Sequence, residues 1–455
     1  MYKKIFGVFI ILLWCVSISA QTLSKKEQKE LQTNAEQALE KAIRYYHSTA
    51  VEGGYVYFHT PDLRERWGET RVDENTIEVQ SPGTPAVGLV VLEAYKVTGN
   101  DFFLQVAKDA GLALAKGQNE LGGWSHTIDF DRVNNGRVSF DDNQTQGAIS
   151  FLMALDQEVD DPKLDQTIDK ALAMMIETQM ENGGWPHMYP PRGNYHDYAT
   201  FNDQGINDCI RVMMEADHYY EDQSYKKSLD KAGNFLMISQ LPPPQPGWAQ
   251  QYNQYLQPAW ARSFEPPSVC PSASLHNINS LLDLYHHTGS RHYLEAIPDA
   301  LDWINSIQLT NGKWARFVEL YTNKPLYYDR GRIRVNSTDE LSEERRTGYG
   351  YENDLTGFIA TVSKRYQNAI NGGRENVLVK KTTEKSMDEM VEQVQNIISQ
   401  LDEEGRWINR NEKYKPANPG KIWDGKTFEQ QDRISSAVFI RNVNLLNQFL
   451  SKVQQ

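Results

Sequence analysis

The chain has 455 residues, of which 40% are hydrophobic, 11% aromatic and 24% charged. This composition is that of a globular protein with a large buried core. The formal net charge of −13 argues against binding to nucleic acid or to anionic membranes. An acidic partner would therefore need a local basic patch or a bound cation.

The first twenty residues have the pattern of a secretory signal peptide. A pair of lysines precedes an apolar run over 5–16, and a small-residue site ends at Ala20. We expect cleavage near Ala20, a secreted or periplasmic protein, and a single domain over 21–455. No other stretch is apolar enough to span a membrane. The mature chain keeps Cys209 and Cys270, which could form a disulfide or remain two buried thiols.

Apolar residues recur at three- and four-residue spacing through most of the chain, which is the helical period. Strand-like alternation is scarce. The sequence therefore predicts an all-α protein, with helices over 25–48, 85–98, 101–118, 144–156, 164–180, 202–220 and 225–240.

The helix ends carry a repeated motif, Q-x-x-x-G-x-W, which ends at Trp124, Trp185 and Trp314. The glycine suits the left-handed conformation that stops a helix, and the tryptophan can pack under the turn. One helical hairpin per repeat follows, in an open solenoid or a closed α/α toroid with long loops and little strand. We predict that the three tryptophans occupy equivalent positions.

In a toroid the inner helices run the same way, so their N-termini gather on one face. Several predicted inner helices begin with polar residues that would ring a cleft there, at 81–85, 141–143, 200–203, 270–272 and 351–354. An acid at a helix N-terminus can simply cap the helix. Asp142 and Asp203, however, stand at one loop position in successive repeats, which favours a shared site. The Tyr- and Arg-rich segment between Trp314 and Gly350 should form loops or short strands over this cleft.

Six motifs then stand in a recognisable order: SPGTP from Ser81, GGWP from Gly183, TFND from Thr200, WAQQY from Trp248, ARSFEPP from Ala261 and ERRTGY from Glu344. This order resembles that of the family 10 pectate lyases (pectic acid lyases), over about 81–351. The resemblance implies an α/α toroid and calcium-assisted β-elimination of polygalacturonate or a related acidic uronate polymer.

The resemblance also implies site residues. Asp203 is similar to a calcium ligand of the family, with Asp142 as a second acid. Arg346 takes the role of the base, with Arg345 second, and Arg262 that of a clamp for the substrate carboxylate. Further substrate-binding candidates are Arg330, Arg332, Asn143, Asn202 and Tyr349.

The residues fit this chemistry in part. Calcium takes oxygen ligands, and a neutralised carboxylate acidifies the neighbouring proton that elimination removes. An arginine base needs a lowered pKa or alkaline conditions. Gln204 and His187 replace an acid and a glutamine of the family pattern, which leaves the calcium requirement and the preferred polymer open.

Other functions also fit the sequence. A toroidal glycoside hydrolase would use Asp142 and Asp203 as acid and base, and a carbohydrate-binding protein would use the cleft without catalysis. A terpene cyclase would use the pair Asp141–Asp142, but export argues against a lipid substrate. We expect a monomeric polysaccharide lyase.

Overall fold

A computed structural model of the chain describes residues 24–132, 136–377, 386–416 and 421–454. The predicted signal peptide and its cleavage site lie outside the described residues. Helices dominate and the strands are short, which confirms the all-α prediction. Within the described ranges, no helix is both long enough and apolar enough to cross a membrane.

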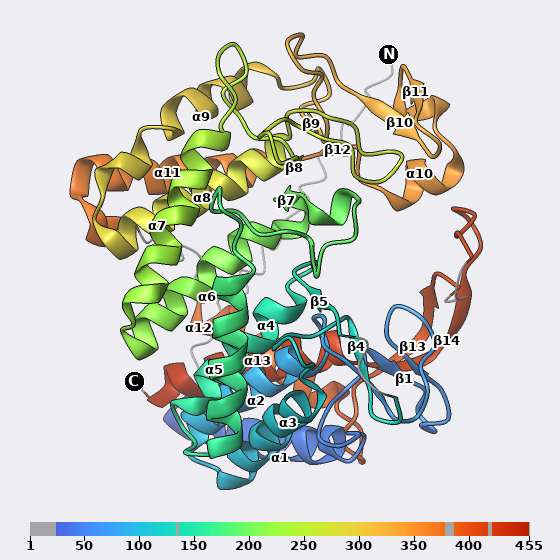
Figure 1. Cartoon of the computed structure of the whole chain (residues 1–455). Coiled ribbons are helices and arrows are strands. Elements are labelled where there is room, and N and C mark those ends of the chain that lie inside the picture. Colours follow the sequence, from blue (N-terminus) through green and yellow to red (C-terminus); the bar gives the residue numbers. More distant parts are fainter. Residues whose placement is uncertain (1–23, 133–135, 378–385, 417–420, 455) are drawn as a thin grey trace, which may run out of the picture.

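The helices form two layers (Figure 1). Inner helices contact one another in the order α13, α2, α4, α6, α8 and α11. The inner layer comprises α2 (Thr84–Thr98), α4 (Gln144–Asp156), α6 (Gly205–Tyr220), α8 (Pro271–Thr288), α11 (Thr356–Gly372) and α13 (Ser436–Gln454). The outer layer comprises α1 (Lys25–His47), α3 (Asp101–Gly117), α5 (Pro162–Glu177), α7 (Gln223–Ser239), α9 (Ile297–Ser306) and α12 (Met387–Gln400). This arrangement is the α/α-toroid architecture that the repeats predict.

The tryptophan of the repeat motif is bonded to the outer helix that precedes it. The indole Nε1 of each predicted tryptophan donates to the carbonyl ten residues earlier, from Trp124 to Leu114, Trp185 to Met175 and Trp314 to Ile304, over 2.8–2.9 Å. All three side chains are buried. The prediction of equivalent positions is therefore confirmed. Trp407 repeats the same bond to Ile397 at 2.8 Å, so the looser C-terminal motif belongs to the same series.

The motif glutamines tie each turn to the next outer helix. Gln118 Nε2 donates to the carbonyls of Gly122 and Thr167, and Gln179 Nε2 to those of Gly183 and Ser228, at 2.8–2.9 Å. Each amide thereby satisfies a carbonyl at the end of one hairpin and a carbonyl in the helix of the next hairpin.

Short antiparallel strands join the loops at the N-terminal ends of the inner helices. The pairs are β3 (Thr76–Glu78) with β4 (Thr127–Asp129), β5 (Val138–Ser139) with β6 (Met188–Tyr189), β7 (Ala199–Thr200) with β8 (Gln251–Tyr252), and β9 (Trp314–Ala315) with β12 (Glu352–Asn353). Strands β5 and β7 lead directly into the acidic segments that begin α4 and α6. The loops of this face are therefore fixed by backbone hydrogen bonds between repeats.

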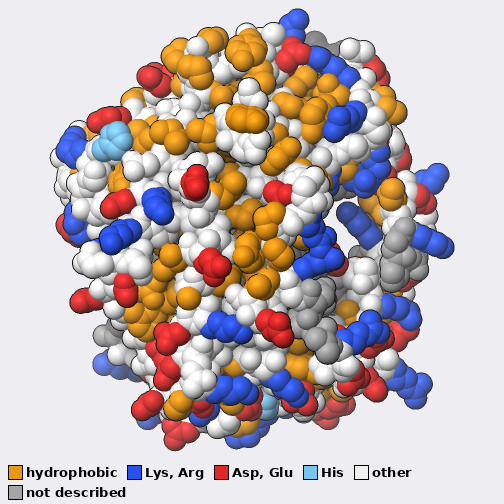
Figure 2. Space-filling model, viewed as in Figure 1, with side chains coloured by type: hydrophobic (Ala, Val, Ile, Leu, Met, Phe, Trp, Pro, Cys, Tyr) orange, Lys and Arg blue, Asp and Glu red, His pale blue; other side chains and the backbone are white. Residues whose placement is uncertain are grey.

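Further strands and a short helix complete this side of the molecule. The Tyr- and Arg-rich segment forms the predicted short strands, β10 (Tyr327–Asp329) paired with β11 (Ile333–Val335), and in addition a short helix that was not predicted, α10 (Glu343–Gly348). A four-stranded sheet has the order β13 (Ile408–Tyr414), β14 (Glu429–Ser435), β1 (Phe58–His59) and β2 (Arg66–Trp67). Beyond its strands the β13–β14 connection reaches α10, where Thr347 Oγ1 donates to the Gly425 carbonyl at 3.0 Å. Figure 2 shows an opening on this side of the surface.

Two sequence expectations are refined by the structure. The helix expected from 202 begins at Gly205, because the chain first makes a short 3-10 turn, Asn202–Gln204. Cys209 and Cys270 are both buried and free, which settles the open alternative in favour of two thiols.

The glutamine clamp gives a stability prediction. Gln179→Leu should lower the free energy of unfolding by about 2 kcal/mol, because two carbonyls lose their donor. Gln308→Leu is the matched control: its amide bonds the Gly312 carbonyl near the solvent, and its loss should cost less than about 1 kcal/mol. Denaturant unfolding of both variants measures the difference. Equal losses would contradict a clamp between hairpins.

Candidate active site

The acidic residues of the cleft lie on two backbone turns of unusual conformation. Asp142 and Asn143 have φ values of 46° and 57°, and Asp203 and Gln204 have 46° and 64°. Residues other than glycine rarely adopt the left-handed region, at a cost of roughly 1 kcal/mol or more each. Asn143 and Gln204, which precede α4 and α6, make no side-chain cap. Helix capping therefore does not explain these acids.

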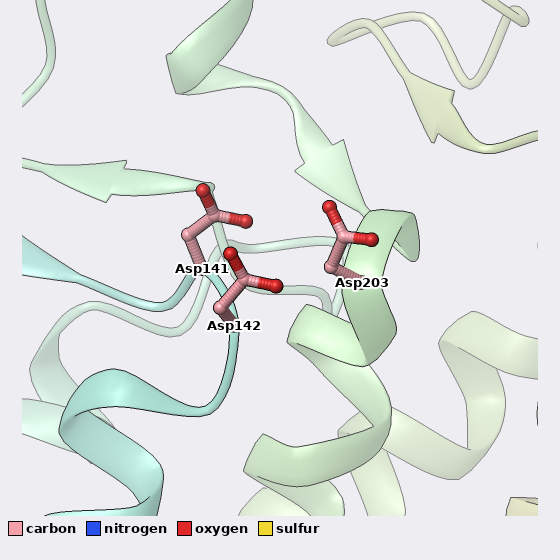
Figure 3. A group of neighbouring side chains, drawn as sticks. All are labelled: Asp141, Asp142 and Asp203. Carbon is pink, nitrogen blue, oxygen red and sulfur yellow. The ribbon is translucent and has the colours of Figure 1, made fainter. Parts of the chain in front are cut away.

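The two turns bring three carboxylates together. Side-chain oxygens of Asp141, Asp142 and Asp203 all lie within 4.8 Å of one another. Figure 3 shows that they come from the neighbouring turns that begin α4 and α6. Such a set of hard oxygen donors suits a calcium ion. The predicted pair of acids thus lies together, and Asp141 joins it as a third.

Asp141 is held by a histidine, and this sets it apart from the other two acids. His187 Nε2 lies 3.0 Å from Asp141 Oδ1. Although burial would raise the pKa of Asp141, the hydrogen bond and the charge of His187 lower it below its ordinary value. Asp141 is therefore ionised over a wide pH range.

The surroundings of Asp142 and Asp203 disfavour their ionised forms. Burial, together with the charges of Asp141 and Asp203, raises the pKa of Asp142 to about 6. Burial and the charge of Asp141 also raise the pKa of Asp203, against the opposing influence of Arg316 and Arg262. A cation bound between them would relieve this repulsion.

Arg262 reaches the cluster from the motif after β8. A cavity of about 100 Å³ is lined by Asp141, His187, Asn202 and Arg262, among others. The guanidinium forms a two-point contact with the buried carboxylate of Glu265, with Nε to Oε2 at 2.8 Å. Burial opposes the charged form, but the bonds to Glu265 hold the pKa of Arg262 above its ordinary value. The described bonds engage Nε and Nη2, which leaves Nη1 for another partner.

Arg316 is a site residue that the sequence reasoning missed. Its Nη2 donates to Asn202 Oδ1 at 3.3 Å, and its guanidinium lies 4.4 Å from the centre of the Tyr349 ring. The sequence signal was its position two residues after the repeat tryptophan Trp314, at the end of a strand that faces the cleft. Arg316 also lowers the pKa of Asp203, so it belongs to the same electrostatic unit.

The arginines predicted as base candidates have other partners. Arg345 is buried, bonds Glu344, and lies 4.1 Å from the centre of the Phe264 ring. Arg346 is exposed and bonds Glu343. Their described contacts include none of the three aspartates.

The remaining predicted substrate residues are also engaged. Arg330 pairs with Glu344 at 3.1 Å, and Arg332 stacks 4.6 Å from the centre of a Trp260 ring. Asn143 Oδ1 accepts a bond from Arg211 Nη2 at 2.8 Å.

Two of these residues lie at the site itself. Asn202 donates to Asp203 and accepts from Arg316. The Tyr349 hydroxyl donates to Glu265 at 2.8 Å.

The contrast between the aspartates predicts opposite effects on stability. Because the folded-state pKa of Asp142, about 6, lies above the ordinary carboxyl value, ionisation costs stability that is absent below about pH 4, grows as the pH rises to about 6 and is complete above it. Without metal at pH 7.5, Asp142→Asn should therefore stabilise the protein by about 1 kcal/mol after solvent screening. Asp141→Asn loses the bond from His187 and should destabilise it by about 1–2 kcal/mol.

Thermal unfolding with chelator at pH 7.5 and pH 5 measures both effects. The gain from Asp142→Asn should shrink at the lower pH. Destabilisation by Asp142→Asn at pH 7.5 would show that its carboxylate is not under repulsive strain.

Comparisons with known proteins identify the family. A model of the pectic acid lyase family matches residues 118–313 and 310–360. A search of curated protein sequences found no match.

Two solved structures of a family 10 polysaccharide lyase from Cellvibrio cellulosa share the fold. One is 21% identical, with a TM-score of 0.51, and the match covers 60% of this chain and 95% of that one. The other, a mutant in complex with trigalaturonic acid, is 22% identical, with a TM-score of 0.50, and covers 56% of this chain and 92% of that one. The family match spans more than half of the chain and includes all three aspartates and both site arginines. The chain belongs to the pectic acid lyase family and is a polysaccharide lyase.

Proposed function

We propose that the protein is a secreted lyase that cleaves polygalacturonate or a related acidic uronate polymer by calcium-assisted β-elimination. The observation that carries this proposal is the meeting of three carboxylates with two arginines in one cleft. The pectic acid lyase match supports the substrate class. The expected signal peptide and the absence of a membrane-spanning helix among the described residues are consistent with export.

The chemistry requires two things of the site. The uronate carboxylate must be neutralised, so that the proton on the adjacent carbon becomes acidic, and a base must then remove that proton. Asp142 and Asp203, with Asp141 beside them, have the donor set to hold calcium. Calcium bound there would link the three aspartates to the acidic substrate and polarise the uronate carboxylate. The role of calcium ligand, predicted for Asp203 and Asp142, stays with them.

The base role is better placed on Arg262 than on Arg346. Arg262 lines the cavity beside Asp141, whereas Arg346 pairs with Glu343 on the surface of α10. Glu265 fixes two guanidinium nitrogens of Arg262, which orients Nη1 for one task. Since the pKa of Arg262 is raised in the free protein, the neutral form is scarce. We expect elimination to be fastest under alkaline conditions.

Arg316 is the candidate for binding the substrate carboxylate. Within the described part of the chain, the guanidinium of Arg316 makes a single hydrogen bond, to Asn202. Most of its N–H donors therefore remain for a ligand. The stack on Tyr349 holds its plane in place. The clamp role therefore moves from Arg262 to Arg316 in this proposal.

The distance between the acids does not separate a lyase from the glycoside hydrolase alternative. Hydrolases with a carboxylate pair separate the two groups by about 5–5.5 Å or about 6.5–9.5 Å, and oxygens of Asp142 and Asp203 within 4.8 Å of each other are compatible with the shorter of these. The pectic acid lyase match is the observation that favours a lyase.

The reaction class can be tested directly on polygalacturonate. The protein should release products with a conjugated double bond, detected by ultraviolet absorbance, and chelation should abolish their formation until calcium is restored. Asp203→Ala should lower calcium affinity at least about tenfold, because a charged ligand is lost. New reducing ends without the double bond would refute the lyase proposal, and chelator-resistant turnover would refute the role of the metal.

The base assignment is tested by a matched pair of conservative variants. Arg262→Lys should lower kcat by about a hundredfold or more, because the ammonium cannot keep the two-point contact with Glu265 and misplaces the proton acceptor. Arg346→Lys should stay within about threefold of the parent in both kcat and KM, as for a surface ion pair. The parent rate should rise with pH through the alkaline range. A larger loss in Arg346→Lys than in Arg262→Lys would return the base role to α10.

A further inference from the structure

A second group of polar side chains, from the segments before α2 and α4 and from the start of α4, acts on Asp142 through Glu69 and His126, and we call it the N-terminal wall. It consists of Tyr57, Glu69, Glu78, His126 and Gln144. Strand β3 ends at Glu78 and pairs with β4, which begins directly after His126. Tyr57, Glu69 and Glu78 all precede the residues matched by the family model. Three of the five wall residues therefore come from the N-terminal segment, ahead of the matched region, and His126 and Gln144 lie within it.

The side chains of the wall hold one another in place. His126 Nε2 lies 3.0 Å from Oε2 of Glu78, which is only 1% exposed. Gln144 Nε2 donates to Gln80 Oε1 at 2.9 Å and lies 3.4 Å from His126 Nδ1. Gln144 directly follows the left-handed pair Asp142–Asn143, so the wall and the aspartate cluster share one turn.

Two buried polar atoms of the wall have no described partner. The Tyr57 hydroxyl and Gln144 Oε1 lack a hydrogen bond within the described part of the chain, and the two residues are 6% and 4% exposed. Buried polar groups in folded proteins are nearly always paired. Unpaired atoms in the neighbourhood of Asp142 therefore indicate hydrogen-bonding capacity for ordered water or for a ligand.

The wall also has the opposite charge to the arginine side. Glu69 and Glu78 bring two carboxylates towards Asp142, against the single imidazole of His126. Burial raises the pKa of Tyr57, and the charges of Glu78, Glu69 and Asp142 act in the same direction. Asp142 in turn feels the charge of Glu69. These residues thus form one electrostatic unit of negative sign.

We propose that the N-terminal wall is a subsite for an uncharged sugar residue, next to the uronate that the aspartate cluster and the arginines bind. This inference rests on the proposed lyase function and names its substrate class: a chain in which a free uronate is followed by a neutral or esterified residue, not an unbroken run of free uronates.

The physical basis is charge and hydrogen bonding. A second free carboxylate at the wall would meet Glu69 and Glu78 and would be repelled. The hydroxyl groups of a neutral sugar would instead donate to these carboxylates and to Gln144 Oε1, which are acceptors. Tyr57 can serve the same residue as a donor or an acceptor. The wall therefore favours an uncharged sugar residue over a negatively charged one at this position of the polymer.

The test compares three polymers: unbroken polygalacturonate, partly methyl-esterified polygalacturonate, and a polymer that alternates uronate with neutral sugar. Formation of the unsaturated product gives kcat/KM for each. The parent protein should prefer at least one of the two polymers with uncharged residues by about tenfold. Which of them it prefers identifies the source of the neutral residue.

Glu69→Lys is the variant to use, because Glu69 is exposed and its replacement spares the buried Glu78–His126 pair. It should reduce the preference about tenfold, chiefly through a lower KM for unbroken polygalacturonate. Glu74→Lys, an exposed change in the same segment, makes the same change of charge outside the wall and should leave the ratio unchanged.

The outcomes separate this inference from the proposed function. If unbroken polygalacturonate is cleaved at least as well as the other polymers and Glu69→Lys changes nothing, the wall does not select and the lyase function stands. If no polymer yields an unsaturated product, the lyase function fails. Calorimetry with a triuronate and with a trisaccharide containing a neutral unit then decides the inference, and equal affinities that Glu69→Lys does not alter would overturn it.

Discussion

The site depends on one backbone constraint, the pair of left-handed turns that begin α4 and α6. Each turn places two successive residues other than glycine in a costly conformation, and each aims an aspartate into the cleft instead of at the helix end. Like charges are then held within 4.8 Å of one another. Neither feature stabilises the free protein, so both must be maintained by the rest of the fold.

That support comes from the repeated architecture. Gln118 and Gln179 fasten one hairpin to the next, the motif tryptophans pack against the helix that precedes them, and the short strand pairs fix the loops from which the turns emerge. His187 illustrates the link between scaffold and site. Its neighbour in sequence, Met188, pairs in β6 with the strand β5 that precedes Asp141, and its ring holds that aspartate ionised. Asp141 therefore stays ionised to a lower pH than Asp142 and Asp203, whose pKa values are raised. A bound cation would favour the ionised forms of those two carboxyls.

Much of the fold could be predicted from the sequence, because the helices and their ends depend on residue patterns that are local in the chain. The helical period and the Q-x-x-x-G-x-W spacing identify the hairpins, and the recurrence of the motif predicts that Trp124, Trp185 and Trp314 are equivalent. Asp142 and Asp203 were predicted to lie together for the same reason, since they occupy one position in successive repeats, whereas Asp141 was not included.

The arginines were harder to place, because their roles depend on long-range partners. Arg346 stands beside Arg345 in a family-like motif, yet it pairs with Glu343 on α10, whereas Arg316 has no motif of its own and reaches Asn202 across the cleft. The left-handed conformation of Asp142 and Asp203 also left no mark in the sequence, since such turns usually carry glycine.

We infer that these two turns together form one cation site in a uronate-binding cleft. Anomalous diffraction from crystals soaked with a calcium-like lanthanide and a uronate oligosaccharide tests this inference. We expect a single strong anomalous peak bonded to oxygens of both Asp142 and Asp203, with a uronate carboxylate on its open side. A peak held by only one of the turns, or by acids elsewhere on the surface, would contradict it.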